Sequence, residues 1–202
     1  MTVMEIDRID TDRIEMPHSS GELTLDAMFE ALEKMPIPEG IKAEIVEGNI
    51  FMSPQRDVHW YIIRRIVRAL EDRFGMNVNV LSDVRVDYPG HLNGFAADVT
   101  LIAEGAVKND KGLWRHQDVT FVAEVISRST KDNDYGPKKT AYATAEVPVY
   151  LIADPYTGRC HVFTEPKNGD YLTELTRTFG QELDLTNTAV GLTLKTDEFP
   201  RD

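Results

Sequence analysis

The stretch VTFVAEVISRSTKDNDYGPKKTAYATAEVPVYLIA, residues 119–153, contains two nearly continuous apolar segments separated by a helical one. The apolar segments, 119–126 and 148–153, have the length of strands, and their lack of alternation predicts strands covered on both faces. Residues 135–145 are predicted to form a short helix with Pro137 in its first turn. A strand, a helix and a second strand in this order predict a βαβ unit.

Further elements on both sides of this unit predict an α/β fold, with a mixed β-sheet flanked by helices. Helical spacing of apolar residues predicts helices over 24–34 and 58–74, and strand-like segments occupy 43–53 (two strands with a turn at 47–49), 78–86, 96–102, 160–165 and 170–177. The tail from residue 181 is weakly patterned. Residues 1–20 lack sustained periodicity, so we expect a flexible N-terminal arm followed by a single domain over 21–202.

The composition is typical of a soluble globular protein, with 42% hydrophobic and 28% charged residues in a chain of 202. No apolar run is long enough to cross a bilayer, and the N-terminus lacks the apolar core of a signal peptide. We therefore expect a cytoplasmic protein without a membrane partner. Cys160 is the only cysteine, which excludes an intrachain disulfide and argues against a cysteine-based zinc site.

The net charge of −12, from 34 acidic and 22 basic residues, opposes tight binding to nucleic acid. This objection concerns affinity and leaves the chemistry of a site open. A local basic stripe or bound cations could offset the overall sign.

Two carboxylates are unusual because they interrupt apolar strands. Asp98 lies within FAADVTLI and Glu124 within TFVAEVIS. A buried acid needs a partner, a shifted pKa or a metal, and facing side chains on adjacent strands lie about 5 Å apart. The pair could therefore hold one hard cation such as Mg²⁺. The alternatives are that each acid pairs with an arginine, caps a loop, or points to solvent on an edge strand.

Lys138 follows Glu124 by 14 residues, in the first turn of the predicted helix. The intervening loop could fold the lysine back over the end of the strand, where its ammonium could stabilise developing negative charge or orient a water. A solvated helix lysine is the alternative, and the neighbouring Lys139 is the competing candidate.

These residues belong to a pattern that resembles a known family. It consists of AEIVEGNIFMSP (43–54), His59, AADVTLI (96–102), FVAEVISRST (121–130) and DYGPKKTAYATAEVPVYLIADP (134–155). In order and spacing it resembles the Uma2 family, also called DUF820, of restriction-endonuclease-like proteins. The resemblance covers about residues 22–165. It implies the PD-(D/E)XK nuclease fold.

The resemblance assigns Asp98 as the motif aspartate and Glu124 as the second acid. The standard motif has a lysine two residues after that acid, where this chain has Ile126. Family members typically carry a lysine four residues before a tyrosine in the next helix, and Lys138 and Tyr142 match that spacing. The resemblance thus implies that Lys138 is the relocated motif lysine.

Two further positions match the family. Glu44 corresponds to the acid of the first strand motif, as an extra metal ligand or a water-positioning acid. His59 corresponds to a recurring histidine, which could contact phosphate, take part in catalysis, cap the helix or pack against the hairpin. Ala97 stands where the family usually has a proline.

The first functional hypothesis is a Mg²⁺-dependent endonuclease that hydrolyses DNA phosphodiester bonds, with Mn²⁺ as a substitute metal. Asp98, Glu124 and the carbonyl of Val125 would hold the metal, and Lys138 would assist the attacking water. Arg64 and Arg68 of the long helix are candidate phosphate contacts. A homodimer would suit cleavage of both strands, through the hairpin at Cys160–Phe163 or the N-terminal arm.

The second hypothesis is a non-enzymatic protein-interaction or regulatory module that retains the nuclease fold. It is favoured by the net charge of −12 and by the lack of an obvious basic cluster in the sequence. Divalent-metal binding separates the two hypotheses, because a ligand that binds only the native state raises its stability.

Overall fold

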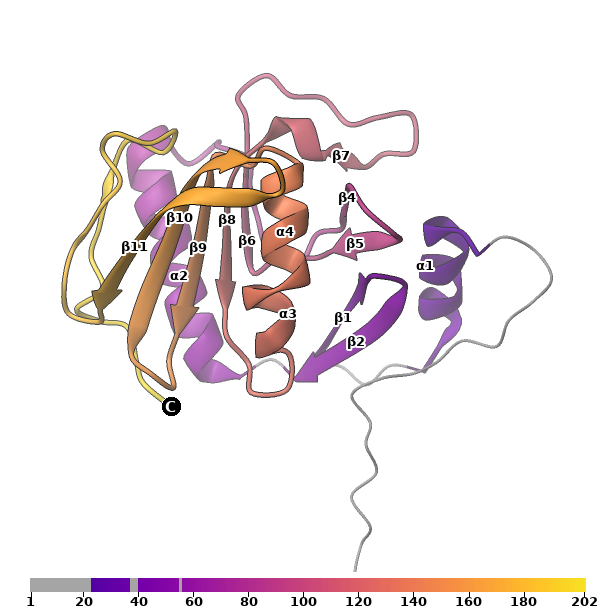
Figure 1. The fold of residues 1–202 in the computed structure, drawn as a ribbon, viewed down its shortest axis with the longest axis horizontal. Helices are drawn as coiled ribbons and strands as arrows, with labels where there is room; N and C mark the ends of the chain where they lie inside the picture. The colour runs from indigo at the N-terminus through magenta and orange to yellow at the C-terminus, as the bar shows by residue number, and fades with distance from the viewer. Residues whose placement is uncertain (1–22, 37–39, 55) are drawn as a thin grey trace, which may run out of the picture.

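The computed structural model describes residues 23–36, 40–54 and 56–202, and the predicted arm over 1–20 lies outside them (Figure 1). Two sheets dominate the fold. They contain all the predicted strand regions, though with changed boundaries in several places. No helix in the described ranges is long and apolar enough to span a membrane.

The main sheet is mixed, as predicted, with the strand order β11-β10-β9-β8-β6-β3. Its strands are β3 (Val80–Leu81), β6 (Val99–Ile102), β8 (Val119–Val125), β9 (Val149–Asp154), β10 (Arg159–Lys167) and β11 (Asp170–Thr178). Only β8 and β9 are parallel within this sheet. They are joined by α3 (Lys131–Tyr135) and α4 (Pro137–Thr144), so the predicted βαβ unit is confirmed.

The second sheet has the order β2-β1-β5-β4-β7. Its strands are β1 (Ile41–Val46), β2 (Asn49–Pro54), β4 (Val86–Tyr88), β5 (Asn93–Phe95) and β7 (Trp114–Arg115), and the 3-10 helix η1 (His116–Asp118) follows β7. The predicted turn between β1 and β2 is present. Glu47 and Gly48 both have positive φ, 50° and 74°, as a two-residue hairpin turn requires.

The prediction of one strand over 78–86 is wrong. The chain instead supplies β3 to the main sheet and β4 to the second sheet. Asp83 lies between them with a φ of 57°, a left-handed conformation that breaks an extended strand. The N–H of Asp83 donates a 3.1 Å hydrogen bond to the carbonyl of Ala97, which ties this break to the segment before β6.

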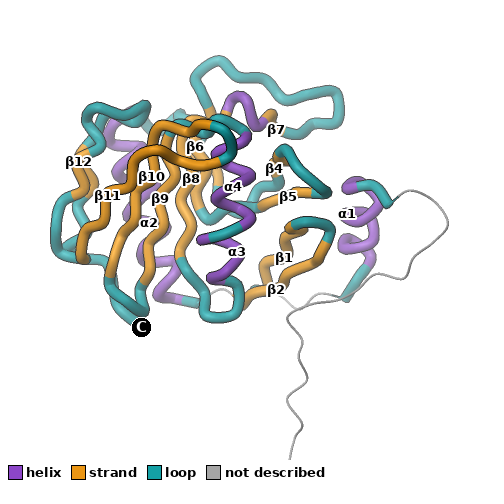
Figure 2. Tube along the Cα trace, in the orientation of Figure 1, coloured by secondary structure: helices purple, strands orange, loops and turns teal. Residues whose placement is uncertain are grey.

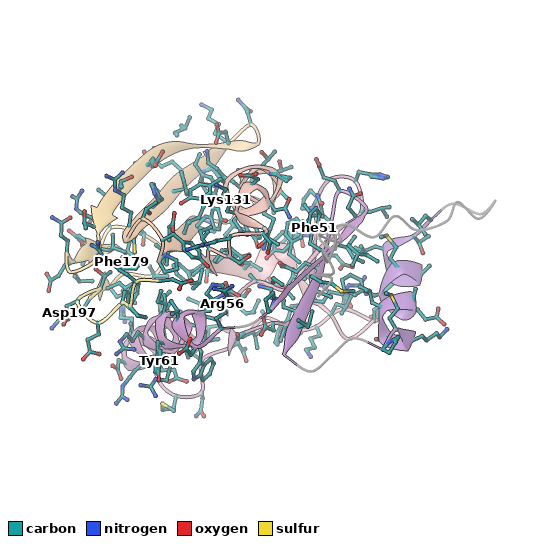
Figure 3. All side chains as sticks on the ribbon, turned by 90° about the horizontal axis from the view of Figure 1, so that it is seen from below. Phe51, Arg56, Tyr61, Lys131, Phe179 and Asp197 are labelled. Carbon is teal, nitrogen blue, oxygen red and sulfur yellow. The ribbon has the colours of Figure 1, made fainter. Side chains whose placement is uncertain are left out.

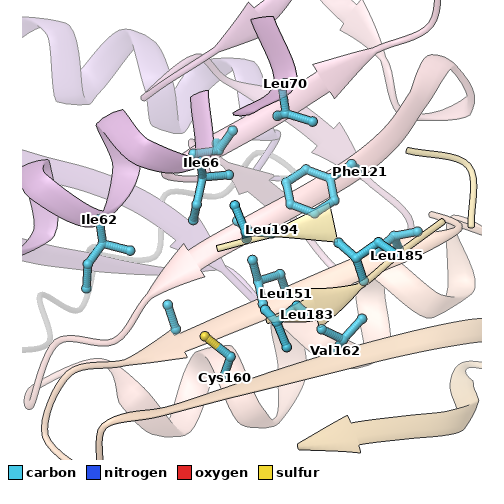
Figure 4. Packing of buried hydrophobic residues seen from close by; sticks show 14 of the residues in the cluster. Ile62, Ile66, Leu70, Phe121, Leu151, Cys160, Val162, Leu183, Leu185 and Leu194 are labelled. Atoms are coloured by element: carbon cyan, nitrogen blue, oxygen red, sulfur yellow. The ribbon is translucent and has the colours of Figure 1, made fainter. Parts of the chain in front are cut away.

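Helices cover both faces of the main sheet, with α4 in front and α2 (Asp57–Phe74) behind it in Figure 1. Side chains of β8 alternate between these faces. Phe121 packs with Ile66 of α2 (Figure 4), whereas Val122 packs with Tyr142 of α4. Glu124 is two residues after Val122, so its side chain points to the same face of the strand, the face that α4 covers. The remaining helix, α1 (Leu25–Lys34), packs on the second sheet through Met28.

The weakly patterned tail is part of the core. It forms the small pair β12 (Leu183–Asp184) and β13 (Thr193–Leu194), beside the main sheet and away from the β1–β2 hairpin (Figure 2). Leu183, Leu194 and Phe199 are buried in the same cluster as α2. Short strands and turns with isolated apolar residues give too little periodicity for this role to be predicted.

Candidate active site

A small cavity lies where the β1–β2 hairpin, the segment just before β6, the end of β8 and the start of α4 meet. Its volume of about 20 Å³ gives room for roughly one water molecule or one small ion. Four acids, two lysines and one histidine are among its lining residues. The lining consists of Lys42, Glu44, Ser53, Pro54, His59, Asp98, Glu124, Val125, Ser127, Thr130, Asp134 and Lys138.

Asp98 and Glu124 lie side by side in this cavity, and both are almost fully buried. The N–H of Val125 donates a 2.7 Å hydrogen bond to Oδ2 of Asp98, and the Asp98 N–H donates to Oε2 of Glu124 at 3.4 Å. The antiparallel pairing of β6 with β8, with Val99 opposite Ala123, produces this proximity. Asp98 precedes the first residue of β6 and is not inside the strand, contrary to the sequence prediction.

Lys138 is buried and its ammonium lies among three carboxylates. Its Nζ is 2.6 Å from Oε1 of Glu124, 3.0 Å from Asp134 and 3.1 Å from Glu44. Burial alone would lower the pKa of Lys138, but attraction to its acidic partners outweighs burial and raises the pKa well above its ordinary value. The alternative of a solvated lysine describes Lys139 better, since Lys139 pairs with the exposed Asp170 at 2.8 Å.

Glu44 connects the second sheet to this cluster. Both of its carboxylate oxygens accept hydrogen bonds of 3.1 Å from Lys138. One of them also accepts a 2.9 Å bond from the N–H of Ala96, two residues before Asp98. Glu44 therefore positions both the Lys138 ammonium and the main-chain segment that carries Asp98.

Lys42 is the central residue that sequence reasoning missed. It lies two residues before Glu44 in β1, on the same face of the strand, and its Nζ is 2.8 Å from Oδ1 of Asp98. The same Nζ is 3.7 Å from Glu44 and 3.7 Å from Glu124. Burial acts to lower the pKa of Lys42, but its carboxylate neighbours raise it above the ordinary value. Lys42 could have been found from its position two residues before Glu44, since residues two apart in a strand point to the same side.

The carboxylates have divergent acidities. Burial would raise the pKa of Glu124, but attraction to Lys138 and Lys42 lowers it to about 2. Asp134, a buried acid that sequence reasoning also missed, behaves in the opposite way. Burial raises its pKa to about 7, with Lys138 opposing the shift and Glu124 adding to it. The site thus contains one acid held ionised and one that takes up a proton near neutral pH.

Tyr142 explains the lysine–tyrosine spacing in α4. It lies one helical turn after Lys138, so both side chains project from the same face of the helix. Its hydroxyl donates a 2.6 Å hydrogen bond to Oε1 of Glu124, the oxygen that Lys138 also contacts. The spacing therefore places two donors on one carboxylate oxygen.

Of the three residues predicted to contact substrate, His59 lines the cavity and Arg64 and Arg68 do not. His59, in the first turn of α2, is buried at the cavity, and its Nε2 has no hydrogen-bond partner in the part of the chain that is described. Burial lowers the pKa of His59, although Asp98 opposes the shift. Arg64 and Arg68 are exposed and do not line the cavity. They lie on the outer side of α2 with Tyr61, which Figure 3 labels.

The donor types of the cavity fit Mg²⁺, because Asp98 and Glu124 supply hard carboxylate oxygens. Each of these acids also accepts a hydrogen bond from the main chain at or beside the other, from Val125 and from Asp98. Among the described residues, however, no three acids, histidines or cysteines form a ready-made metal-binding group. The ammonium of Lys42 lies between the two acids instead. The carboxylate oxygens therefore fit a metal in their donor chemistry, and the Lys42 ammonium stands beside both of them.

Comparisons with known proteins were consistent with one family. A model of the Uma2 family, described as "Putative restriction endonuclease", matches residues 29–197. The crystal structure of "a putative nuclease belonging to DUF820" from Anabaena variabilis ATCC 29413 superposes with a TM-score of 0.66 over 88% of this chain and 97% of that chain. The two sequences are 14% identical, so this likeness confirms the fold. A search of curated proteins found no match.

Proposed function

The chain belongs to the Uma2 family, and we propose that it is a Mg²⁺-dependent endonuclease that hydrolyses DNA phosphodiester bonds. The observation that carries the proposal is the burial of Asp98, Glu124 and Lys138 in one hydrogen-bonded cluster. Burying this many charged groups is costly, and such clusters with strongly shifted pKa values are typical of active sites.

In this proposal Asp98, Glu124 and the carbonyl of Val125 hold the metal. Bound Mg²⁺ would activate a water and neutralise charge on the phosphate. Lys138 stabilises the additional negative charge of the transition state and orients the water. Glu44 fixes the direction of the lysine through its two 3.1 Å hydrogen bonds.

Contacts to DNA would come from α2 and the histidine at its start. Residues 56–73 contain five arginines against three acids, which makes the segment basic in a chain of net charge −12. Arg64 and Arg68 are exposed there and free to approach phosphates, whereas Arg65 pairs with Glu198 at 3.0 Å. His59 lies at the cavity itself, where its Nε2 has no hydrogen-bond partner among the described residues.

The test is a cleavage assay on supercoiled, linear and single-stranded DNA with Mg²⁺ or Mn²⁺. The wild-type protein should cut at least one form. Asp98→Asn, which keeps the side-chain shape, should lose roughly 100-fold or more in rate, because even the loss of a partner that only orients a metal ligand costs about 10–100-fold. Asp170→Asn, at an exposed acid paired with Lys139, is the matched control and should cut normally. Equal background cleavage by the wild type and Asp98→Asn on every substrate would refute the proposal.

The second candidate is a non-enzymatic module of the same fold. It is favoured by the size of the cavity, about 20 Å³, which is too small for a phosphodiester group without opening. Thermal denaturation separates the two. A melting temperature that does not respond to Mg²⁺ or Mn²⁺ favours the module, and a rise that Glu124→Gln abolishes favours the enzyme.

A further inference from the structure

The ammonium of Lys42 covers one oxygen of each acid proposed as a metal ligand. It is 2.8 Å from Oδ1 of Asp98 and 3.7 Å from Oε2 of Glu124. The Lys42 side chain is only 8% exposed, so these carboxylates replace most of its water shell. Its position is set by β1, which also supplies Glu44, 3.7 Å away.

Groups of the protein already engage the other two oxygens. Oδ2 of Asp98 accepts the 2.7 Å hydrogen bond from the N–H of Val125. Oε1 of Glu124 pairs with Lys138 at 2.6 Å. Among the described residues, Oε2 of Glu124 accepts only the long 3.4 Å bond from the Asp98 N–H, so a cation that bridges the two acids would bind Oδ1 and Oε2, which are the oxygens nearest Lys42.

Lys42 and a metal ion cannot share this position. Mg²⁺ binds oxygen at about 2.0–2.1 Å and keeps several waters. The cavity of about 20 Å³ holds no more than one water or ion beside the ammonium. Two cations a few ångströms apart also repel each other strongly in a buried site.

We propose that Lys42 is a tethered counter-cation of the metal site. In the metal-free protein its ammonium occupies the bridging position, 2.8 Å from Asp98 and 3.7 Å from Glu124, and holds the two carboxylates close together. It leaves that position when Mg²⁺ binds. The inference rests on the proposed metal site and adds a specific competitor to it.

Asp83 indicates where the ammonium goes. Its Oδ1 is 3.8 Å from Lys42 Nζ, and its side chain is 34% exposed, which places it on the solvent side of the cluster. A small rotation of the flexible lysine side chain would exchange Asp98 for Asp83 and free the bridging oxygens. The displaced ammonium would remain near the entrance, available to a phosphate.

The first experiment measures Mn²⁺ and Mg²⁺ binding by calorimetry without DNA. Lys42→Met removes the charge and keeps most of the side-chain volume. It should bind metal roughly tenfold tighter or more, since a competing unit charge is gone, and should melt at a lower temperature without metal. Lys42→Arg keeps the charge and should bind as weakly as the wild type. Lys139→Met, at a half-buried lysine outside the cavity, is the control and should change neither the metal affinity nor the melting temperature.

The second experiment uses the wild-type protein, so it does not depend on a variant that folds. An amine-acylating reagent is applied with and without Mg²⁺, and the modified lysines are identified by mass spectrometry. Lys42 should be protected without metal and become reactive with it, whereas Lys138 should stay protected in both states. Unchanged protection of Lys42 under conditions where calorimetry shows bound metal would overturn the proposal.

The outcomes separate this inference from the proposed function. If the wild type and Lys42→Met bind metal with equal affinity, or the variant binds more weakly, Lys42 is an ordinary structural ion pair and the nuclease proposal stands. If neither protein binds metal, the metal site is wrong and both proposals fail.

Discussion

Replacing Lys138 by methionine should destabilise the protein strongly, because it leaves several buried acids without their shared cation. The Nζ atom lies 2.6 Å from Glu124, 3.0 Å from Asp134 and 3.1 Å from Glu44, all of them buried. Removing one partner of a buried ion pair costs about 3–5 kcal/mol. For a domain of this size, 1 kcal/mol shifts the melting temperature by about 2–4 °C, so we expect a decrease of roughly 6–20 °C.

The loss of stability of Lys138→Met relative to the wild type should depend on pH. In the wild type, the pKa of Glu124 is held at about 2 against an ordinary value of 4.5, so its contribution to stability is present above pH 4.5 and is lost as the pH falls towards 2. Without Lys138, burial favours the protonated acid. The difference in stability between wild type and variant should therefore be largest near neutral pH and shrink below pH 4.5.

The assay is urea unfolding followed by circular dichroism at several pH values, with Lys139→Met measured in parallel. Lys139 is partly exposed and its pair with Asp170 should be worth only about 0–1 kcal/mol. If Lys138→Met loses no more stability than Lys139→Met at pH 7, the ammonium of Lys138 does not hold the cluster together, and the reasoning fails.

Two other variants test the same cluster from its other members. Tyr142→Phe removes the 2.6 Å hydrogen bond to Glu124 and should cost about 1.5–3 kcal/mol in urea unfolding, whereas Tyr61→Phe, on the exposed side of α2, should cost almost nothing. Asp134→Asn mimics the protonated acid. Because the pKa of Asp134 is raised to about 7, its contribution to stability is present below pH 3.8 and is lost as the pH rises through 7, so the variant should show a flatter stability profile over this range. A profile identical to that of the wild type would contradict this role for Asp134.

The sequence allowed the two acids to be recognised for a local reason. Asp98 and Glu124 interrupt apolar segments, and the cost of burying a charge makes such an interruption informative without any knowledge of the fold. Their mutual contact also followed from adjacent strands, although Asp98 lies just before β6. The βαβ unit was predictable in the same way, because each of its segments has the length and pattern of its element.

Lys42 and Asp134 could not be recognised by local reasoning. Lys42 lies in a hairpin of the second sheet, where a single lysine is normally solvated. Its side chain is only 8% exposed because this sheet meets the end of the main sheet. Asp134 belongs to the polar segment KDNDY of α3, which has no apolar periodicity. The burial of both depends on contacts between segments far apart in the chain.

Ile126, two residues after Glu124, and Lys138 of α4 lie on the same side of the main sheet. Because Ile126 is two residues after Glu124, its side chain points to the same face of the sheet. There it packs in the cluster that includes Tyr142 of α4. A lysine there would approach Glu124 from the strand, but this face is covered by α4. The helix can supply the ammonium from above, and it does so at 2.6 Å. In this chain the strand position is therefore apolar and packed, and the ammonium that meets Glu124 comes from the helix.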